Sequence, residues 1–250
     1  MAAAQSTRQE AWRWCARQDT AISRQTQIAG CSWLIESGQE TPQYQAIALN
    51  SRGIARAALL DQAGAMNDYS EAIRADPQNT TSFNLRGLLR AAQGDRAGAI
   101  SDYTEAIRLN PQAAEAFNNR GLARAGEADR VGAIADYTEA IRRNPQFALA
   151  FNNRGFAKAG QGDREGAIAD YTEAIRHNPQ FALAFNNRGF ARAGQGDRAG
   201  ALADYTEAIR LNPQFALAYN NRGAARSRQG DSAGAIADYS EAIRLNPQDA

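Results

Sequence analysis

The chain has 250 residues, and its 28 lysines and arginines nearly balance its 27 aspartates and glutamates, giving a formal net charge of +1. This balance gives no electrostatic reason to expect nucleic acid or an acidic membrane surface as a partner. No apolar run approaches the roughly 20 residues that cross a bilayer, so we expect no membrane insertion. Residues 1–10 are polar and lack the apolar stretch of an export signal.

The first 45 residues differ from the rest of the chain. We expect residues 1–7 to be a disordered N-terminus. Residues 8–45 are interpreted as a divergent helical hairpin and loop, which carries all three tryptophans and both cysteines. The segment 38–45 contains Pro42 and is expected to be a longer loop that joins this hairpin to the regular part of the chain.

The two cysteines of the hairpin, Cys15 and Cys31, are 16 residues apart. The same separation joins Gly53 to Tyr69 in the part of the chain that follows. The spacing therefore places the cysteines at two facing positions and favours a disulfide over two reduced, buried thiols. A disulfide indicates an oxidising compartment. We expect a periplasmic or secreted protein whose signal is not present in this sequence, with a cytoplasmic protein as the alternative.

From residue 46 to 250 the sequence repeats itself every 34 residues. In one unit, the pattern predicts a first helix from about Ala148 to Gly160 and a second from Arg164 to His177, with Asp163 as the N-cap. The run Asp-Tyr-Thr-Glu-Ala-Ile-Arg, with Ser for Thr in two copies, begins at Asp68, Asp102, Asp136, Asp170, Asp204 and Asp238. A fixed period of this length predicts stacked helix pairs, none of which buries its apolar face alone.

The repeat resembles the tetratricopeptide repeat family in its period and in its small, aromatic and proline positions. The matching residues of one unit are Phe151, Gly155, Ala167, Tyr171, Ala174 and Pro179. Two positions differ from the family pattern: its Leu is replaced by Arg in every unit, and its first Tyr is replaced by Arg or Lys. The resemblance implies an all-α, right-handed superhelical solenoid with six repeats over residues 46–250. The cysteine-containing hairpin is similar to that of bacterial secreted or periplasmic members.

The same resemblance implies a function, a non-enzymatic scaffold that binds a peptide segment or protein partner in its concave groove. The sequence itself offers no catalytic pattern, because His177 is the only histidine and no nucleophile–base pair, phosphate loop or zinc spacing accompanies it. We therefore expect no enzyme, no cofactor and no metal site. The alternative function is that of a structural protein whose solenoids stack end to end into homo-oligomers or filaments.

Each unit has an arginine before its glycine and a second basic residue four positions later, such as Arg154 and Lys158. Residues four apart lie on one face of a helix. A cationic strip for an acidic partner is one interpretation. Because every unit also carries a matching aspartate such as Asp170, the pattern favours a built-in network of ion pairs instead.

Paired asparagines recur on the predicted first helices, with apolar residues one turn away. In the resembled family, an asparagine on this face binds the backbone of an extended peptide, since an amide both donates and accepts. The candidate peptide-binding residues are Asn118, Asn119, Asn152, Asn153, Asn186, Asn187, Asn220, Asn221, Leu149, Phe156, Leu183 and Phe190. Amides that only bridge adjacent helices are the alternative. Recognition of a C-terminal carboxylate in this family needs Lys or Arg on this face, and the small neighbours here, such as Ala159 and Gly160, argue against it.

Overall fold

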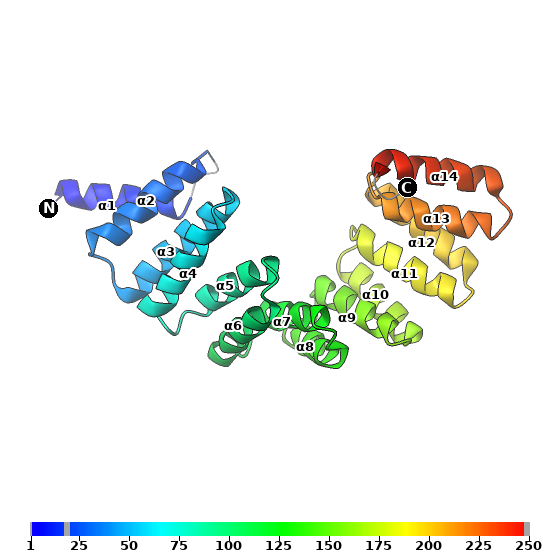
Figure 1. Cartoon of the computed structure of the whole chain (residues 1–250), viewed down its shortest axis with the longest axis horizontal. Coiled ribbons are helices and arrows are strands. Elements are labelled where there is room, and N and C mark those ends of the chain that lie inside the picture. Colours follow the sequence, from blue (N-terminus) through cyan, green and yellow to red (C-terminus); the bar gives the residue numbers. More distant parts are fainter. Residues whose placement is uncertain (1, 18–20, 248–250) are drawn as a thin grey trace. The chain divides into compact units, whose positions relative to one another are not determined.

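The computed structural model describes residues 2–17 and 21–247, and within these ranges all regular structure is α-helical (Figure 1). The helices are α1 (Ala2–Cys15), α2 (Arg24–Ser37), α3 (Pro42–Ala58), α4 (Gln62–Ala75), α5 (Thr80–Ala92), α6 (Arg96–Leu109), α7 (Ala114–Gly126), α8 (Arg130–Arg143), α9 (Ala148–Gly160), α10 (Arg164–His177), α11 (Ala182–Gly194), α12 (Arg198–Leu211), α13 (Ala216–Ser227) and α14 (Ser232–Leu245). None of the helices in these ranges is both long enough and apolar enough to cross a membrane.

The chain divides into two compact units, Met1–Glu127 and Ala128–Ala250. In the first unit, helices α1 to α7 pack in chain order, each against the next. In the second unit, α8 packs on α9, and the pairs α9/α10, α11/α12 and α13/α14 follow one another in the same way. The prediction of an all-α helical repeat solenoid is confirmed.

The helices of one repeat begin and end where the local sequence predicts. Asp163 precedes α10, and its carboxylate accepts a hydrogen bond from the Gly166 backbone amide at 2.9 Å. This bond satisfies one of the amides that have no partner inside the helix. At the other end, Asn178 adopts an extended backbone before Pro179, because proline disfavours the α conformation of its predecessor.

The core of each repeat lies between its two helices and is built from small residues around one tyrosine. In α10, Ala167, Tyr171 and Ala174 are buried at one face of the helix. The Tyr171 ring lies against Gly155 of α9, where a side chain would occupy its space. The small residues therefore bring the helices close enough for one large ring to fill the space between them.

Two expectations about the N-terminal region are corrected by the structure. Helix α1 begins at Ala2, so residues 2–7 are helical where a disordered segment was expected, and residue 1 lies outside the described residues. The expected loop 38–45 ends at Thr41, because Pro42 is the first residue of α3 and Thr41 is its N-cap. Proline suits that position, since its missing N–H would have no helical partner there.

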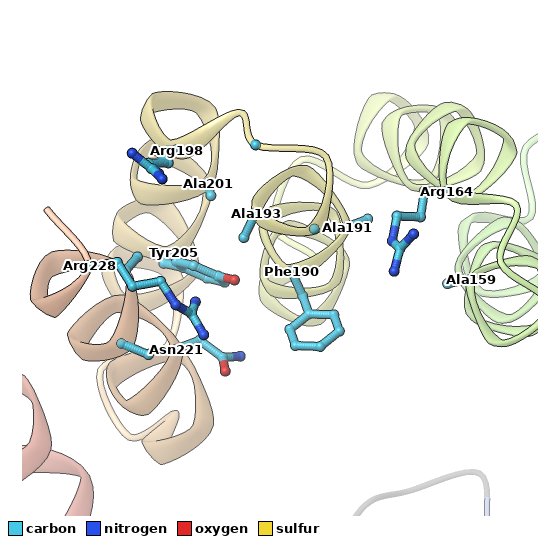
Figure 2. A pocket seen from close by; sticks show the side chains of 14 residues that line it. Ala159, Arg164, Phe190, Ala191, Ala193, Arg198, Ala201, Tyr205, Asn221 and Arg228 are labelled. Atoms are coloured by element: carbon cyan, nitrogen blue, oxygen red, sulfur yellow. The ribbon is translucent and has the colours of Figure 1, made fainter.

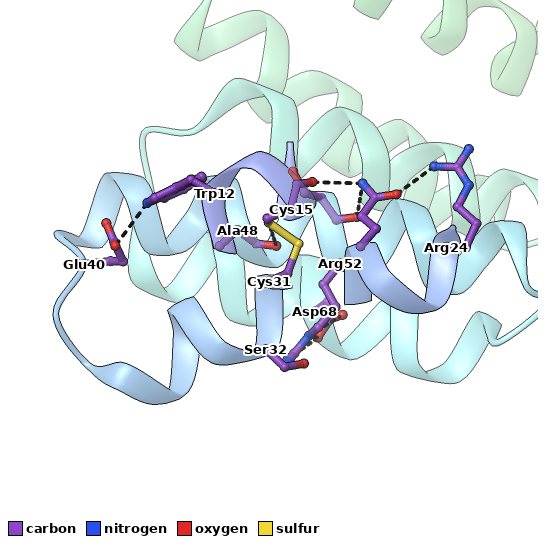
Figure 3. Close-up of a disulfide and its surroundings, with 11 residues drawn as sticks. Trp12, Cys15, Arg24, Cys31, Ser32, Glu40, Ala48, Arg52 and Asp68 are labelled. Carbon is purple, nitrogen blue, oxygen red and sulfur yellow. Dashed lines mark hydrogen bonds and ion pairs between the residues drawn. A yellow bond between two sulfur atoms is a disulfide. The ribbon is translucent and has the colours of Figure 1, made fainter. Parts of the chain in front are cut away.

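The first helix pair has a disulfide at its centre (Figure 3). Cys15 of α1 and Cys31 of α2 are bonded and fully buried, packed with Leu34 and with Ala48 of α3. The disulfide predicted from their spacing is confirmed. The two cysteines join the helices at the positions where later pairs place a glycine against a tyrosine ring.

A polar cluster fixes the far end of the same pair. The Arg8 guanidinium donates to both carboxylate oxygens of Glu40 at 2.7 and 2.8 Å, and the Trp12 indole donates to Oε1 at 3.1 Å. The hydrogen bond from Arg8 holds the pKa of Glu40 below its ordinary value. These bonds tie α1 to the loop that enters α3.

Candidate functional site

The paired basic residues of each repeat form ion pairs inside their own helix pair. Arg154 Nη2 lies 2.6 Å from Asp170 Oδ1, and Lys158 Nζ lies 2.9 Å from Asp170 Oδ2. Asp170 is buried. The equivalent sets are Arg52, Arg56 and Asp68; Arg86, Arg90 and Asp102; Arg188, Arg192 and Asp204; and Arg222, Arg226 and Asp238. In these sets the predicted ion-pair network is confirmed. The aspartates neutralise these basic residues, which therefore do not form a cationic strip for an acidic partner.

A second set of arginines pairs with glutamates on the exposed side of the second helices. Arg176 lies 2.8 Å from Glu173, three residues earlier on α10. The same arrangement recurs at Arg74, Arg108, Arg142, Arg210 and Arg244. Exposed pairs of this kind add little stability, but they neutralise the outer surface.

A third set of arginines has no carboxylate within 4.0 Å among the described residues. In the second unit it comprises Arg130, Arg164 and Arg198, each the first residue of a second helix, and Arg228, which follows α13. Arg164 lies beside Gly194, the last residue of α11, where an added Cβ would come within 3.0 Å of Nε. The carbonyl groups at a helix C-terminus attract a cation, and the glycine leaves room for it.

These arginines were not predicted from the sequence. The neighbouring residues on each first helix, such as Ala159 and Gly160, are small, so no basic residues were expected on that face. The structure brings a guanidinium there from the second helix of the preceding repeat, as with Arg130 beside Gly160. The available signal was an arginine directly after the N-cap aspartate, such as Arg164 after Asp163, together with a glycine at the end of the following first helix, such as Gly194.

The asparagine pairs connect successive first helices. Asn187 of α11 donates from Nδ2 to Asn152 Oδ1 of α9 at 3.1 Å, and Asn221 of α13 donates to Asn186 Oδ1 at 2.9 Å. Within the repeats of α9 and α11, the first asparagine of the pair also lies within hydrogen-bond distance of the second, at 3.5 and 3.4 Å. In the first unit, Asn119 donates to Asn84 at 3.3 Å.

Burial divides the predicted asparagines into two groups. The first member of three pairs is buried, which corrects the expectation that both members line a groove; these residues are Asn118, Asn152 and Asn186. The second members are half-buried, and Asn220 is exposed; the half-buried ones are Asn119, Asn153, Asn187 and Asn221. The bridging role therefore holds for the buried amides, whereas the half-buried ones keep an edge toward solvent.

The predicted apolar residues are exposed beside these amides. Phe156 and Phe190 leave 68% and 67% of their surface accessible, while Leu149 and Leu183 leave 41% and 39%. On α11, Leu183, Asn187 and Phe190 follow one another at helical spacing and so share one face. Polar and apolar groups therefore alternate along the first helices of the second unit.

A cavity of about 450 Å³ opens on this face between α11 and α13 (Figure 2). Phe190 stands at its edge, the buried Tyr205 of α12 lies behind it, and Asn221 approaches from α13. Three arginines of the third set, Arg164, Arg198 and Arg228, also line it, and none of its fourteen lining residues is acidic. A second cavity of about 420 Å³ lies on α13 and α14, lined by Leu217, Asn220, Tyr239 and Ile243 among others.

His177 has a packing role in the structure. Its ring stacks on Phe151 with centroids 5.6 Å apart, and Nε2 lies 3.7 Å from a Glu173 oxygen. Within residues 2–17 and 21–247, no three His, Cys, Asp or Glu side chains gather in a way that could hold a metal ion.

Comparison with known proteins agrees with this architecture. The family described as Tetratricopeptide repeat matches residues 216–249, and that described as TPR repeat matches 87–126, 159–196 and 194–230, together just over half of the chain. The chain belongs to the tetratricopeptide repeat family. Repeats of this family are generally non-catalytic and serve protein–protein interaction, so the chain is an interaction scaffold. No curated protein gave a significant match.

Several solved structures share the fold. MamA has 26% sequence identity and a TM-score of 0.59, covering 65% of this chain and 95% of that chain. YrrB, described as a TPR protein with an unusual peptide-binding site, has 21% identity and a TM-score of 0.59, covering 75% and 95%. PilW, described as a widely conserved type IV pilus biogenesis factor, has 18% identity and a TM-score of 0.73, covering 81% and 94%.

Proposed function

We propose that the second unit binds an extended peptide segment of a protein partner along the first helices α9, α11 and α13. The observation that carries the proposal is the cavity beside Phe190, whose ring is 67% exposed in the free chain. Large exposed aromatic groups next to a cavity are typical of binding sites, because burial of the ring against a ligand is favourable. YrrB provides a fold-level parallel, as a repeat protein described as having a peptide-binding site.

The half-buried asparagines supply the polar part of such a groove. The Asn187 side chain donates one N–H to Asn152 Oδ1. Its own oxygen, Oδ1, accepts from Asn186 Nδ2 at 3.4 Å. A side-chain amide has two N–H groups and two oxygen lone pairs, so one donor and one acceptor site remain. That capacity matches one peptide unit of a ligand, while the bonds to the neighbouring asparagines hold the amide in place.

A peptide-display selection on the full chain, followed by titration of a selected peptide, tests this proposal. Phe190→Ala is expected to weaken binding by about 1–3 kcal/mol, because the apolar burial of the ring is lost. Val131→Ala is the matched control, since Val131 is 74% exposed in the same unit and does not line the cavity. Equal loss in both variants, or none in either, would place the peptide elsewhere and refute the proposal.

A second candidate function is self-assembly through the face of α13 and α14 that contains the second cavity. Ile243 is 49% exposed there, whereas its repeat equivalent Ile209 is 9% exposed under α13. A helix from another copy of the chain could pack on α14 in the way that α13 packs on α12, and it would then cover this face. Solution mass across a concentration series tests the idea: Ile243→Glu should abolish any association, and Ala237→Glu, whose equivalent Ala203 stays exposed, should not. A constant monomer mass for the unmodified chain excludes it.

We also propose that the protein works in an oxidising compartment, the periplasm or the cell exterior. The support is the fully buried disulfide between Cys15 and Cys31, since stable disulfides are rare in reducing compartments. Alkylation of protein taken directly from its native cells tests this. Recovery of both thiols in alkylated form contradicts the proposal.

A further inference from the structure

The cavity beside Phe190 concentrates positive charge that the described residues do not neutralise. Apart from Arg130, the other arginines of the second unit pair with aspartates or glutamates, as shown by Arg188 with Asp204 and Arg210 with Glu207. Arg164, Arg198 and Arg228 have no such partner, and all three line the same cavity. The cavity is therefore a local cationic site in a chain whose formal net charge is only +1.

Arg228 distinguishes this cavity from its equivalents along the array. The preceding repeats of the second unit have glycine at that position, namely Gly194 and Gly160. There, a single arginine of the preceding helix lies beside the glycine. Beside α13, Arg198 and Arg228 both line the cavity, so two like charges share one cavity whose lining residues include no carboxylate. Like charges repel one another, and a bound anion relieves that repulsion.

Two of the three arginine side chains, those of Arg164 and Arg228, are directed toward the space between the helices (Figure 2). Figure 2 shows the Arg228 guanidinium reaching between Tyr205 and Asn221, and Arg164 extending toward the opposite side of Phe190. Burial raises the pKa of Tyr205 to about 12, and the nearby positive charge of Arg228 opposes that rise. The phenol consequently stays protonated at neutral pH and adds a hydroxyl donor behind the arginines.

We propose that this cavity gives the groove its specificity by binding an acidic peptide segment, with a carboxylate side chain between Arg198 and Arg228 and a neighbouring apolar side chain on Phe190. The inference rests on the proposed peptide groove and names the chemistry of its ligand. Guanidinium groups bind carboxylates through paired N–H donors, and the three arginines are exposed and so accessible to such a group. The exposed Phe190 ring supplies the apolar surface that a purely ionic site would lack.

A peptide fits these observations better than a nucleic acid. An extended polyanion needs a continuous basic track, and most basic residues of the second unit are already paired with carboxylates. One cavity with three arginines instead suits one or two carboxylates of a segment whose other residues lie along the amides of Asn187 and Asn221.

Fluorescence anisotropy of the full chain with three labelled peptides of equal length tests the proposal. The peptides share their leucines and phenylalanine and differ only in carrying Glu, Gln or Lys at the remaining positions. The Glu peptide should bind about tenfold tighter than the Gln peptide, a difference that decreases with added salt. An oligothymidylate is included as a nucleic-acid probe and should not displace the Glu peptide.

The decisive variant carries Arg164→Gln, Arg198→Gln and Arg228→Gln, and should lose the preference for Glu. Its control carries Arg176→Gln, Arg210→Gln and Arg244→Gln, which change the net charge equally on the outer side and should keep it. Arg228→Gly restores the residue of the earlier repeats and should weaken the preference for the Glu peptide in part. If the triple variant does not fold, this single variant tests the proposal in its place.

The outcomes separate this inference from the proposed groove. Equal binding of the three peptides, reduced by Phe190→Ala, would keep the groove and refute the acidic specificity. Equal loss in both triple variants would assign the preference to net charge and refute the cavity. Displacement of the Glu peptide by oligothymidylate, or no binding of any of the three peptides, would also refute the acidic specificity. The display selection tests the peptide groove independently of these results.

Discussion

The ring of Tyr171 lies so close to Gly155 that a Cβ added to the glycine would come within 2.9 Å of the Cε1 atom of the ring. The same hypothetical Cβ would lie 3.1 Å from the backbone oxygen of Ala167. The same glycine–tyrosine contact recurs in other repeats: Gly53 and Tyr69, Gly87 and Tyr103, Gly189 and Tyr205, and Gly223 and Tyr239. The contact sets how closely the two helices of a pair approach.

Gly155→Ala should therefore destabilise the second unit by about 1–3 kcal/mol, because the added methyl group overpacks a close contact. Gly160→Ala is the matched control on the same helix. Its Cβ would meet only the Arg130 side chain, at 3.3 Å, and alanine favours the helix more than glycine does. Denaturant titration of both variants measures the difference; a Gly155 variant as stable as the Gly160 variant would contradict the packing argument.

In the first pair, a covalent bond between Cys15 and Cys31 takes the place of the glycine–tyrosine contact. Replacing both cysteines with alanine should cost about 3 kcal/mol, from the chain entropy of closing a loop of this length. Hydrogen exchange should show the loss first in α1 and α2, since the bond lies in that cluster. The unmodified chain in reductant should behave like the variant. Unchanged protection of both helices would mean that other contacts hold the pair.

Asp170→Asn should destabilise the second unit by about 2–3 kcal/mol, because it leaves Arg154 and Lys158 side by side without their buried carboxylate. The comparison variant is Glu173→Gln, which breaks the exposed pair with Arg176 and should have a much smaller effect. Thermal melts of the two variants decide the order. The reverse order would assign the stabilising charge pairs to the outer surface.

The buried tyrosines should make the protein less stable at alkaline pH. Burial raises the pKa of Tyr69 and Tyr205 to about 12, and raises that of Tyr103, Tyr137 and Tyr171 as well. In the unfolded chain a tyrosine ionises near pH 10. The unfolded state therefore binds fewer protons between about pH 10 and 12, so the free energy of unfolding falls as pH rises through that window.

Denaturant midpoints measured from neutral pH to the upper end of that window check this expectation. They should be constant below about pH 10 and fall above it. Tyr205→Phe removes one of the ionisable groups and should make the fall shallower. An unchanged slope in that variant would show that Tyr205 does not contribute to the alkaline instability.

The elements of the fold could be predicted from sequence because their signals are local. Asp163 and Pro179 mark the limits of one helix by their own backbone chemistry, and the structure places α10 between them. The pairing of Cys15 with Cys31 followed from the repeat, since one spacing recurs in every unit. Pro42 was misread because proline both breaks helices and begins them, and only the cap at Thr41 distinguishes the two.

The candidate site was only partly predictable, because it depends on contacts between repeats. The exposure of Phe156 and Phe190 agreed with their helical spacing. The asparagine column did not reveal which member of each pair is buried, since that depends on the neighbouring first helix. Nor could spacing within one helix show that Arg164 reaches the end of α11 from the preceding repeat.

The last prediction concerns the asparagine pairs and compares the two amides of one hydrogen bond, Asn187 and Asn152. Asn152 is buried and accepts from Asn187 at 3.1 Å, whereas Asn187 is half-buried and keeps an edge toward the groove. Asn187→Ala should lower stability by about 1 kcal/mol, because the Asn152 oxygen loses its donor, and should weaken a selected peptide by about 1–3 kcal/mol. Asn152→Ala should lower stability more, since its amide is the buried member of the pair.

A melting curve and a peptide titration on each variant separate the two roles of the amides. If Asn187→Ala has a lower melting temperature but binds the peptide with unchanged affinity, the paired asparagines serve only to join helices. The ligand is then held by the apolar and charged groups around Phe190. If affinity falls while the melting temperature changes little, the half-buried asparagines contact the peptide. We expect the second pattern for Asn187 and the first for Asn152, because only the former has donor and acceptor capacity left on the exposed side.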